Sequence, residues 1–143
     1  MKQISILRLG TAALVLAASG QLAFAASANL PPVQHQGNIT YLSGGVGSDE
    51  STAIKDAMHQ YPLTLEFAGK TQSGNDYLAD IPVQVSDMHG TTLLKTVAHG
   101  PFLLASLPSG RYSVTATYNG KTEHRTVTVA SSTQVREVFL WPM

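Results

Sequence analysis

Histidine is the residue type in this chain with the clearest potential chemistry, because imidazole nitrogens bind copper and zinc. The five histidines have neither the spacing of a zinc finger nor that of a helical metal site; they are His35, His59, His89, His99 and His124. His89 and His99 flank one predicted strand, which separates them by about 25 Å at about 3.3 Å per residue. They cannot share a metal ion. We therefore predict surface and turn histidines, with no metal site and no cofactor.

Methionine thioethers are soft ligands that copper accepts, and Met58, Met88 and Met143 could accompany the histidines. The sequence has no methionine-rich run, and Met58 falls on the predicted apolar face of a helix. A periplasmic metal carrier is therefore kept only as the second alternative function.

Nucleophilic and acid–base catalysis find little support in the sequence. The absence of cysteine removes thiol nucleophiles, thiolate metal sites and disulfides. No serine lies in a G-x-S-x-G motif. Spacing along the chain does not exclude a pair of glycosidase carboxylates, but Asp80 and Asp87 flank a predicted strand rather than a cleft. We predict that the protein is not an enzyme and has no catalytic residues.

A glycine run, Gly44-Gly45-Val46-Gly47, leads into a predicted helix. Such a loop at a helix N-terminus can hold a phosphate group. However, no Lys-Ser/Thr pair follows it, as a P-loop would require. Asp49 and Glu50 would also repel an anion. The sequence therefore predicts a flexible loop before a capped helix.

The first 25 residues have the three parts of a signal peptide. Lys2 and Arg8 make its start positive, an apolar stretch covers 9–18, and Ala23-Phe24-Ala25 fits the cleavage rule. Gly20 and Gln21 interrupt the apolar run before the roughly 20 residues that a membrane span needs. We expect cleavage after Ala25, with no lipid anchor because no cysteine is present. The expected location is periplasmic or secreted, without membrane insertion after cleavage.

The remaining residues, 26–143, suit one domain with a single core. They carry seven basic and nine acidic side chains, without a basic cluster. This weakly acidic balance gives no electrostatic footprint for nucleic acid. Lacking disulfides, the domain must depend on its hydrophobic core.

One helix is predicted before the strands. Residues 26–47 form a leader and the glycine-rich loop, with a short strand expected over 38–42. The sequence predicts a helix over 48–61, with Ser48 as its N-cap and acidic residues in its first turn. Its apolar residues recur at i, i+3, i+4 and i+7, which places them on one face: Ile54, Ala57, Met58 and Tyr61.

Residues 62–143 change to a period of two and contain about seven short strands. We place these at 63–67, 81–85, 91–98, 102–107, 112–118, 121–130 and 133–141. Short strands with turn residues at regular spacing are typical of a sandwich or a barrel. The predicted fold class is mainly β: a seven-stranded antiparallel β-sandwich preceded by one α-helix.

Asn119-Gly120 is the strongest hairpin signature in the chain. A two-residue turn there pairs Tyr118 with Lys121, and the ladder then pairs Tyr112 with Val127. Directly opposed residues share a face, so Tyr112 and Val127 should both point into the core. The same register puts Glu123 and Arg125 on the core side near the tip. There we expect the tip to overhang the core and leave both solvated, with a functional ion pair as the alternative.

Several segments resemble the carboxypeptidase regulatory-like domain, a prealbumin-like (transthyretin-like) β-sandwich. They are Ile81-Pro-Val-Gln-Val85, Asp87-Met-His-Gly90, Gly100-Pro-Phe-Leu-Leu104 and Leu107-Pro-Ser-Gly-Arg-Tyr-Ser-Val114, followed by Asn119-Gly120. The similarity covers about 62–141 and excludes the helix, which looks like a feature of short exported proteobacterial proteins. In that family the domain accompanies other proteins and is not catalytic. The resemblance therefore implies binding or scaffolding.

The leading expectation is thus an exported, non-enzymatic protein that binds a cell-envelope protein partner through a free sheet edge. The first alternative is a carbohydrate or small-ligand module, which needs two exposed aromatic residues side by side. The available aromatic residues are Tyr41, Tyr77, Tyr118 and Trp141. Trp141 has two interpretations at this stage, a plug at the end of the core or an exposed binding residue.

Overall fold

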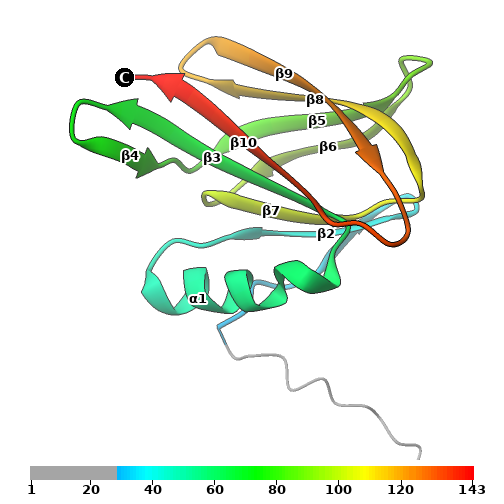
Figure 1. Cartoon of the computed structure of the whole chain (residues 1–143), viewed down its shortest axis with the longest axis horizontal. Coiled ribbons are helices and arrows are strands. Elements are labelled where there is room, and N and C mark those ends of the chain that lie inside the picture. The colour runs from blue at the N-terminus through cyan, green and yellow to red at the C-terminus, as the bar shows by residue number, and fades with distance from the viewer. Residues whose placement is uncertain (1–28) are drawn as a thin grey trace, which may run out of the picture.

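Two β-sheets face each other across a common core, and one helix lies on the outer side of one sheet (Figure 1). This computed structural model describes residues 29–143, so the predicted signal peptide, 1–25, lies outside the described residues. The elements are β1 (Gln34–Gln36), β2 (Ile39–Gly44), α1 (Ser48–Ala57), a 3₁₀ turn (Met58–Gln60), β3 (Leu63–Thr71), β4 (Gly74–Tyr77), β5 (Ile81–Asp87), β6 (Thr92–Ala98), β7 (Phe102–Ser106), β8 (Gly110–Tyr118), β9 (Lys121–Val129) and β10 (Val135–Pro142).

Sheet A contains six strands in the order β1-β2-β7-β3-β10, with β4 paired to β3. Two parts of the fold prediction are wrong here. The described chain has ten strands rather than seven, and β10 pairs with β3 in parallel, starting at Val135 opposite Leu63. Moreover, the short strand expected over 38–42 is confirmed as β2, but it belongs to sheet A, so the sandwich begins before residue 62. The mainly β, two-sheet architecture is confirmed.

Sheet B contains four antiparallel strands in the order β6-β5-β8-β9. The predicted hairpin register is confirmed, with Tyr118 opposite Lys121 and Tyr112 opposite Val127. Asn119 and Gly120 both have positive φ, 51° and 78°, as a type I′ turn requires. Tyr112 and Val127 are buried in the core, as their shared face predicted. A local turn preference and strand alternation were therefore sufficient to fix this pairing.

The core between the sheets ends in a group of aromatic rings. The Trp141 side chain is 1 % exposed, stacks against Phe139 at 6.1 Å between ring centroids, and contacts the tilted ring of Tyr118 at 5.8 Å. Its indole N–H donates to the carbonyl of Lys121 at 3.0 Å. Trp141 therefore closes the hairpin end of the core, as the first of its two interpretations proposed.

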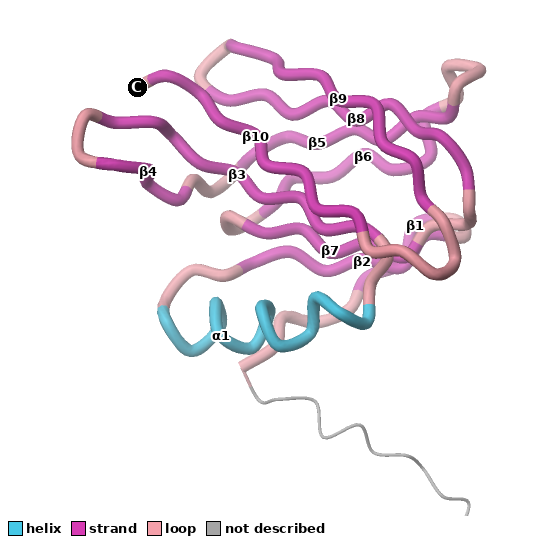
Figure 2. The backbone as a smooth tube through the Cα atoms, in the orientation of Figure 1, coloured by secondary structure: helices cyan, strands magenta, loops and turns pink. Residues whose placement is uncertain are grey.

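Helix α1 packs against the outer face of sheet A (Figure 2). Its buried Ile54 and Ala57 meet the side chains of Leu42, Phe102 and Leu104. Met58 and Tyr61 join this cluster, so the predicted apolar face is confirmed. The helix start differs from the prediction. Gly47 is the N-cap, no side chain caps the helix, and Ser48 is already helical.

Candidate functional site

The outer face of sheet B is covered by no other element of the described chain and is called the open face (Figure 1). Strand alternation defines it, because the buried residues of each strand point towards sheet A and the intervening ones point outward. The outward positions are Pro82, Gln84, Ser86, Lys95, Val97, Arg111, Ser113, Thr115, Thr117, Thr122, His124, Thr126 and Thr128. Most have short hydroxyl side chains, so this face is polar and most of its side chains are short.

A hollow of about 410 Å³ lies at one end of the open face. The pairing of β5 with β8 stops at Val83 and Ala116, although β8 continues to Tyr118. Pro82, next along β5, has no backbone N–H to extend the ladder. The hollow lies where the ladder stops, and Pro82 and Val97 are opposed at its rim. Val97 is 40 % exposed, so the hollow has an apolar wall.

The charges of the open face have one sign. Lys95 and Arg111 occupy outward positions, whereas none of the outward positions in β5, β6, β8 and β9 is Asp or Glu. Ser113 lies 2.6 Å from the His124 Nε2 atom. A catalytic histidine is oriented by a third group, and the outward positions of the described strands β5, β6, β8 and β9 supply no carboxylate. We interpret the contact as a cross-strand hydrogen bond.

A second concave region, the base pocket, lies at the end of the sandwich opposite the Asn119-Gly120 turn. Three segments build it: the chain after α1, the β7–β8 loop and the β9–β10 loop (Figure 2). Its volume is about 560 Å³, and its lining residues are His59, Gln60, Tyr61, Pro62, Ser106, Leu107, Pro108, Ser109, Ala130, Ser131, Ser132, Thr133 and Gln134. In sandwich folds, loops gathered at one end are a common place for binding residues.

Hydrogen bonds fix the segments of the base pocket: one is local to the β7–β8 loop, and two join the β9–β10 loop to the chain after α1. The Tyr112 hydroxyl donates to the Pro108 carbonyl at 2.5 Å. The Val135 amide donates to the Pro62 carbonyl at 2.8 Å. The Gln134 side chain donates to the His59 carbonyl. Burial raises the pKa of Tyr61, and burial together with the nearby Asp87 carboxylate raises the pKa of Tyr112. Both phenols therefore remain neutral hydrogen-bond donors at ordinary pH.

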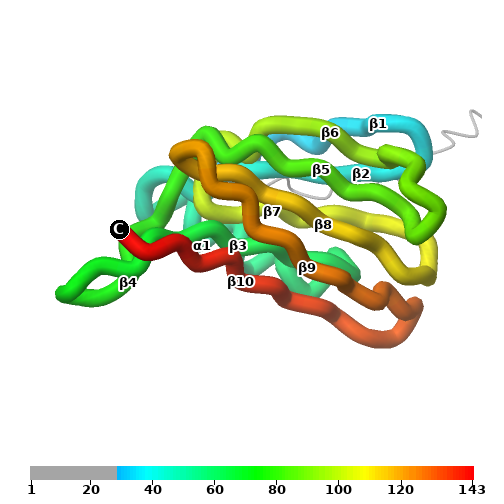
Figure 3. The backbone as a smooth tube through the Cα atoms, turned by 90° about the horizontal axis from the view of Figure 1, so that it is seen from above, coloured from blue at the N-terminus to red at the C-terminus, as the bar shows by residue number. Residues whose placement is uncertain are grey.

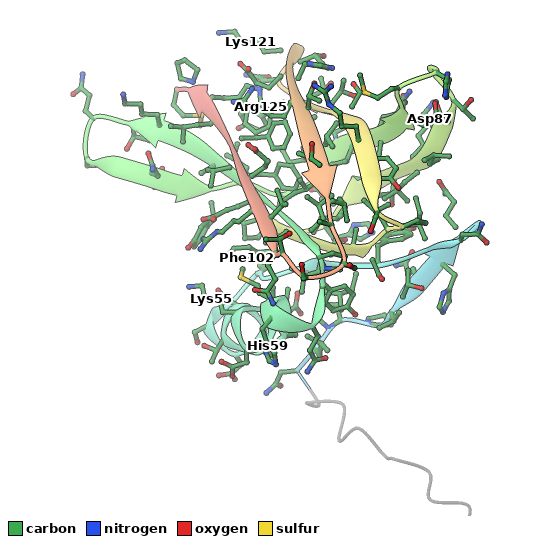
Figure 4. All side chains as sticks on the ribbon, turned by 45° about the vertical axis from the view of Figure 1, so that its right-hand side comes forward. Lys55, His59, Asp87, Phe102, Lys121 and Arg125 are labelled. Atoms are coloured by element: carbon green, nitrogen blue, oxygen red, sulfur yellow. The ribbon has the colours of Figure 1, made fainter. Side chains whose placement is uncertain are left out.

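The structure separates the histidines. His89 and His99 lie at opposite ends of β6, as predicted. His99 is next to β2, where its amide bonds Ser43, whereas His124 lies on β9 at the other edge of sheet B. His35 contacts Thr40 in β2, and His59 lines the base pocket (Figure 4). Within residues 29–143, no three His, Cys, Asp or Glu side chains group as metal ligands would.

The glycine run before α1 holds a carboxylate from its own helix. The Gly45 amide donates to the Glu50 carboxylate at 2.7 Å. A Cβ atom at Gly45 would lie 2.6 Å from the Phe102 ring, and one at Gly100 would collide with the Gly44 backbone. Because Glu50 occupies the donor that an anion would need, the loop is a tight helix–sheet junction. Close packing therefore restricts Gly44 and Gly45, whereas an added Cβ at Gly47 would meet nothing within 4 Å.

The four candidate aromatic residues do not form a platform. Tyr77 is 54 % exposed on β4, but Tyr41 and Trp141 are buried, and Tyr118 is partly covered by Trp141. Two exposed aromatic side chains side by side were the requirement for a stacking surface. The aromatic-platform form of carbohydrate binding therefore has no support among the residues that the structure describes.

The long sheet edges are partly closed (Figure 3). At β6, the Gln36 side-chain amide bonds both the amide of Lys95 at 2.7 Å and its carbonyl at 3.3 Å. Beside β9 lies β10, where Trp141 bonds the Lys121 carbonyl. Free backbone groups are what an added strand requires. The free-edge mode of partner binding is therefore less favoured than binding to the open face.

The Glu123 and Arg125 side chains do not overhang the core as expected. They form an ion pair at 3.4 Å, each about one-third exposed, and the Arg125 guanidinium lies 5.2 Å from the Phe139 ring centroid (Figure 4). Arg125 thus links β9 to a ring of β10. It is the ion-pair alternative in geometry, with a packing role between the two sheets.

The sequence did not point to the base pocket, because its lining comes from three segments that are more than 20 residues apart. The only available sign was the run of small polar residues over 130–134.

Residues 29–143 include no helix with the length and apolar character to cross a bilayer. No protein-family model and no curated protein matches this chain.

Proposed function

We propose that the chain is an exported, non-enzymatic β-sandwich protein that binds a cell-envelope protein through the open face of sheet B. The observation that carries this proposal is the apolar pair Pro82 and Val97 at the rim of a hollow on a face that α1 leaves uncovered. Protein interfaces combine an apolar centre with a polar rim. Here Pro82 and Val97 would be the apolar centre of the interface, and threonine hydroxyls, Gln84 and Lys95 would form the polar rim around them.

The charge of the open face supports a particular kind of partner. Lys95 and Arg111 would meet acidic groups favourably, since no outward position of β5, β6, β8 or β9 is Asp or Glu. Complementary charge raises association rates and excludes basic surfaces. The proposed partner is therefore a protein with an acidic rim around an apolar side chain that enters the hollow.

Two further parts of the proposal concern compartment and family. We propose that residues 1–25 are removed as a signal peptide, which places the domain in the periplasm or outside the cell. We also propose that the sandwich is of the prealbumin-like, carboxypeptidase regulatory-like type. Its support is that the resembling segments 81–85 and 107–114 supply two adjacent strands of sheet B, β5 and β8. Cleavage is tested by N-terminal sequencing of the protein after export.

The binding proposal is tested with two matched substitutions on opposite outer faces. Val97 on β6 is 40 % exposed and Val138 on β10 is 42 % exposed, so glutamate should be tolerated equally well at both positions. Residues 26–143, wild type and each variant, are immobilised and exposed to envelope extract at low and high salt. We expect one envelope protein to be retained by wild type and Val138→Glu and lost by Val97→Glu, with weaker retention at high salt. Equal retention by both variants, or none by wild type, would contradict the proposal.

A further inference from the structure

We propose that the base pocket binds a small, neutral, polyhydroxylated compound, a mono- or disaccharide in chemical class. This site goes beyond the proposed protein-binding function and shares no residue with the hollow of the open face. The volume of about 560 Å³ lies within the range of about 300–1,000 Å³ found for ligand pockets.

The chemistry of the lining selects against charged ligands. None of the residues that line the pocket is Lys, Arg, Asp or Glu. An ionic ligand would therefore lose its hydration without gaining a counter-ion, which is unfavourable. The polar lining residues instead carry six hydroxyl groups and two carboxamides, from Tyr61, four serines, Thr133 and the glutamines at 60 and 134, together with the imidazole of His59. Hydroxyls both donate and accept hydrogen bonds, as the hydroxyls of a sugar do.

Apolar groups in the lining match the other property of sugars, their C–H faces. Tyr61, Pro62, Leu107 and Pro108 lie among the polar residues. An aromatic ring with a hydroxyl can contact an apolar surface and donate a hydrogen bond at once. Because burial raises the pKa of Tyr61, its hydroxyl keeps its proton well above neutral pH and remains a donor.

The walls are fixed before any ligand arrives. Tyr112 holds the β7–β8 loop through Pro108, and Gln134 holds the β9–β10 loop to the end of the helical segment through His59. Val135 adds a backbone bond to Pro62. A preformed site loses less conformational entropy on binding than a mobile one. The helical segment, which the resembling family lacks, thus supplies one wall of the pocket.

The experiment follows ¹⁵N-labelled residues 26–143 by NMR during titration with glucose, maltose and N-acetylglucosamine, with glucose 6-phosphate as the charged probe. We expect saturable shifts from at least one neutral sugar, confined to 59–62, 106–109 and 130–134, and weaker binding of the phosphate. No saturable shift with any neutral sugar would overturn the proposal. Equal or tighter binding of glucose 6-phosphate would also overturn it, because it would show an anion site.

Four variants make the test specific. Ser109→Trp should fill the pocket and abolish binding, whereas Ser73→Trp, on the exposed β3–β4 turn, should leave it unchanged. Tyr61→Phe keeps the packed ring and removes the hydroxyl, so affinity should fall about fivefold. Unchanged binding in Ser109→Trp would contradict the site. Val97→Glu should leave sugar binding intact, so the failure of this proposal is distinguishable from the failure of the protein-binding one.

Discussion

The outer faces of the two sheets differ although both sheets share one core. On sheet A, Leu42, Phe102 and Leu104 are fully buried on the outside, because α1 covers them with Ile54 and Ala57. On sheet B, the corresponding outward positions are mostly threonine and serine and have no cover. Sheet A is therefore a middle layer, whereas sheet B is an outer one that is free for contact with other molecules.

The residue pattern of each strand indicates whether one or both of its faces are buried. In β7 the run Phe102-Leu-Leu-Ala105 is apolar at every position, as expected for a strand buried on both sides. In β8 the apolar positions alternate with Arg, Ser and Thr, as expected for one solvated face. Lys55 extends from α1 to within 6.0 Å of the Phe102 ring centroid and helps to cover it (Figure 4). The helix is thus a structural layer of the sandwich.

The largest effect is expected on the outer face of sheet A, which α1 covers. Phe102→Ala should lower the free energy of unfolding by about 3–5 kcal/mol, because a fully buried ring is replaced by a cavity between α1 and sheet A. Thr115→Ala, on the open face, should change it by less than about 0.5 kcal/mol. Urea denaturation followed by circular dichroism measures both. Equal losses of unfolding free energy in the two variants would show that the covered face and the open face contribute equally to stability.

The next effect concerns the junction that holds the helix to sheet A. A methyl group at Gly100 would collide with the backbone of Gly44, so Gly100→Ala should cost about 1–3 kcal/mol. Gly110→Ala is the matched control, because its Cβ would meet only Tyr112 atoms at ordinary contact distances of 3.5 Å and more. Thermal unfolding of the two variants tests the expected order. If Gly100→Ala left the unfolding temperature unchanged, the backbone at the junction could shift to accommodate the added methyl group.

A smaller effect is expected at Tyr112, whose hydroxyl fixes the β7–β8 loop. Tyr112→Phe removes the bond to Pro108 and should cost about 1 kcal/mol near neutral pH. Folding raises the pKa of Tyr112 above its ordinary value of 10.0, mainly through burial. The neutral phenol is thus favoured in the folded state, and this stability is present below pH 10 and lost as pH rises above it. The variant should therefore lose less stability than wild type between pH 9 and 11, as urea midpoints at each pH would show.

The smallest effect on stability is expected at the edge of sheet B. Gln36→Ala exposes the Lys95 amide and carbonyl to water, which solvates them, so the change should stay within about 0.5 kcal/mol. An uncovered edge strand is a template for pairing with other chains. We expect faster aggregation at high concentration, measured by light scattering. Gln34→Ala, also on β1, is the control and should aggregate like wild type.

The sequence by itself determined the features that depend on neighbouring residues. The apolar face of the helix and the Asn119-Gly120 register follow from local periodicity and turn geometry, and both were confirmed. The mainly β, two-sheet class followed from strand spacing. The N-cap was predicted one residue too late, at Ser48: Gly47 takes this place with a positive φ of 88°, which glycine adopts without strain, and no side chain caps the helix.

Only the tertiary structure decided which distant segments meet. The parallel pairing of β10 with β3, the placement of β2 within sheet A and the three walls of the base pocket join residues far apart in the chain. Strand alternation states which side of a strand is buried but not which strand lies beside it. That choice depends on the packing of the whole core, because only the complete set of contacts offsets the entropy of closing long loops.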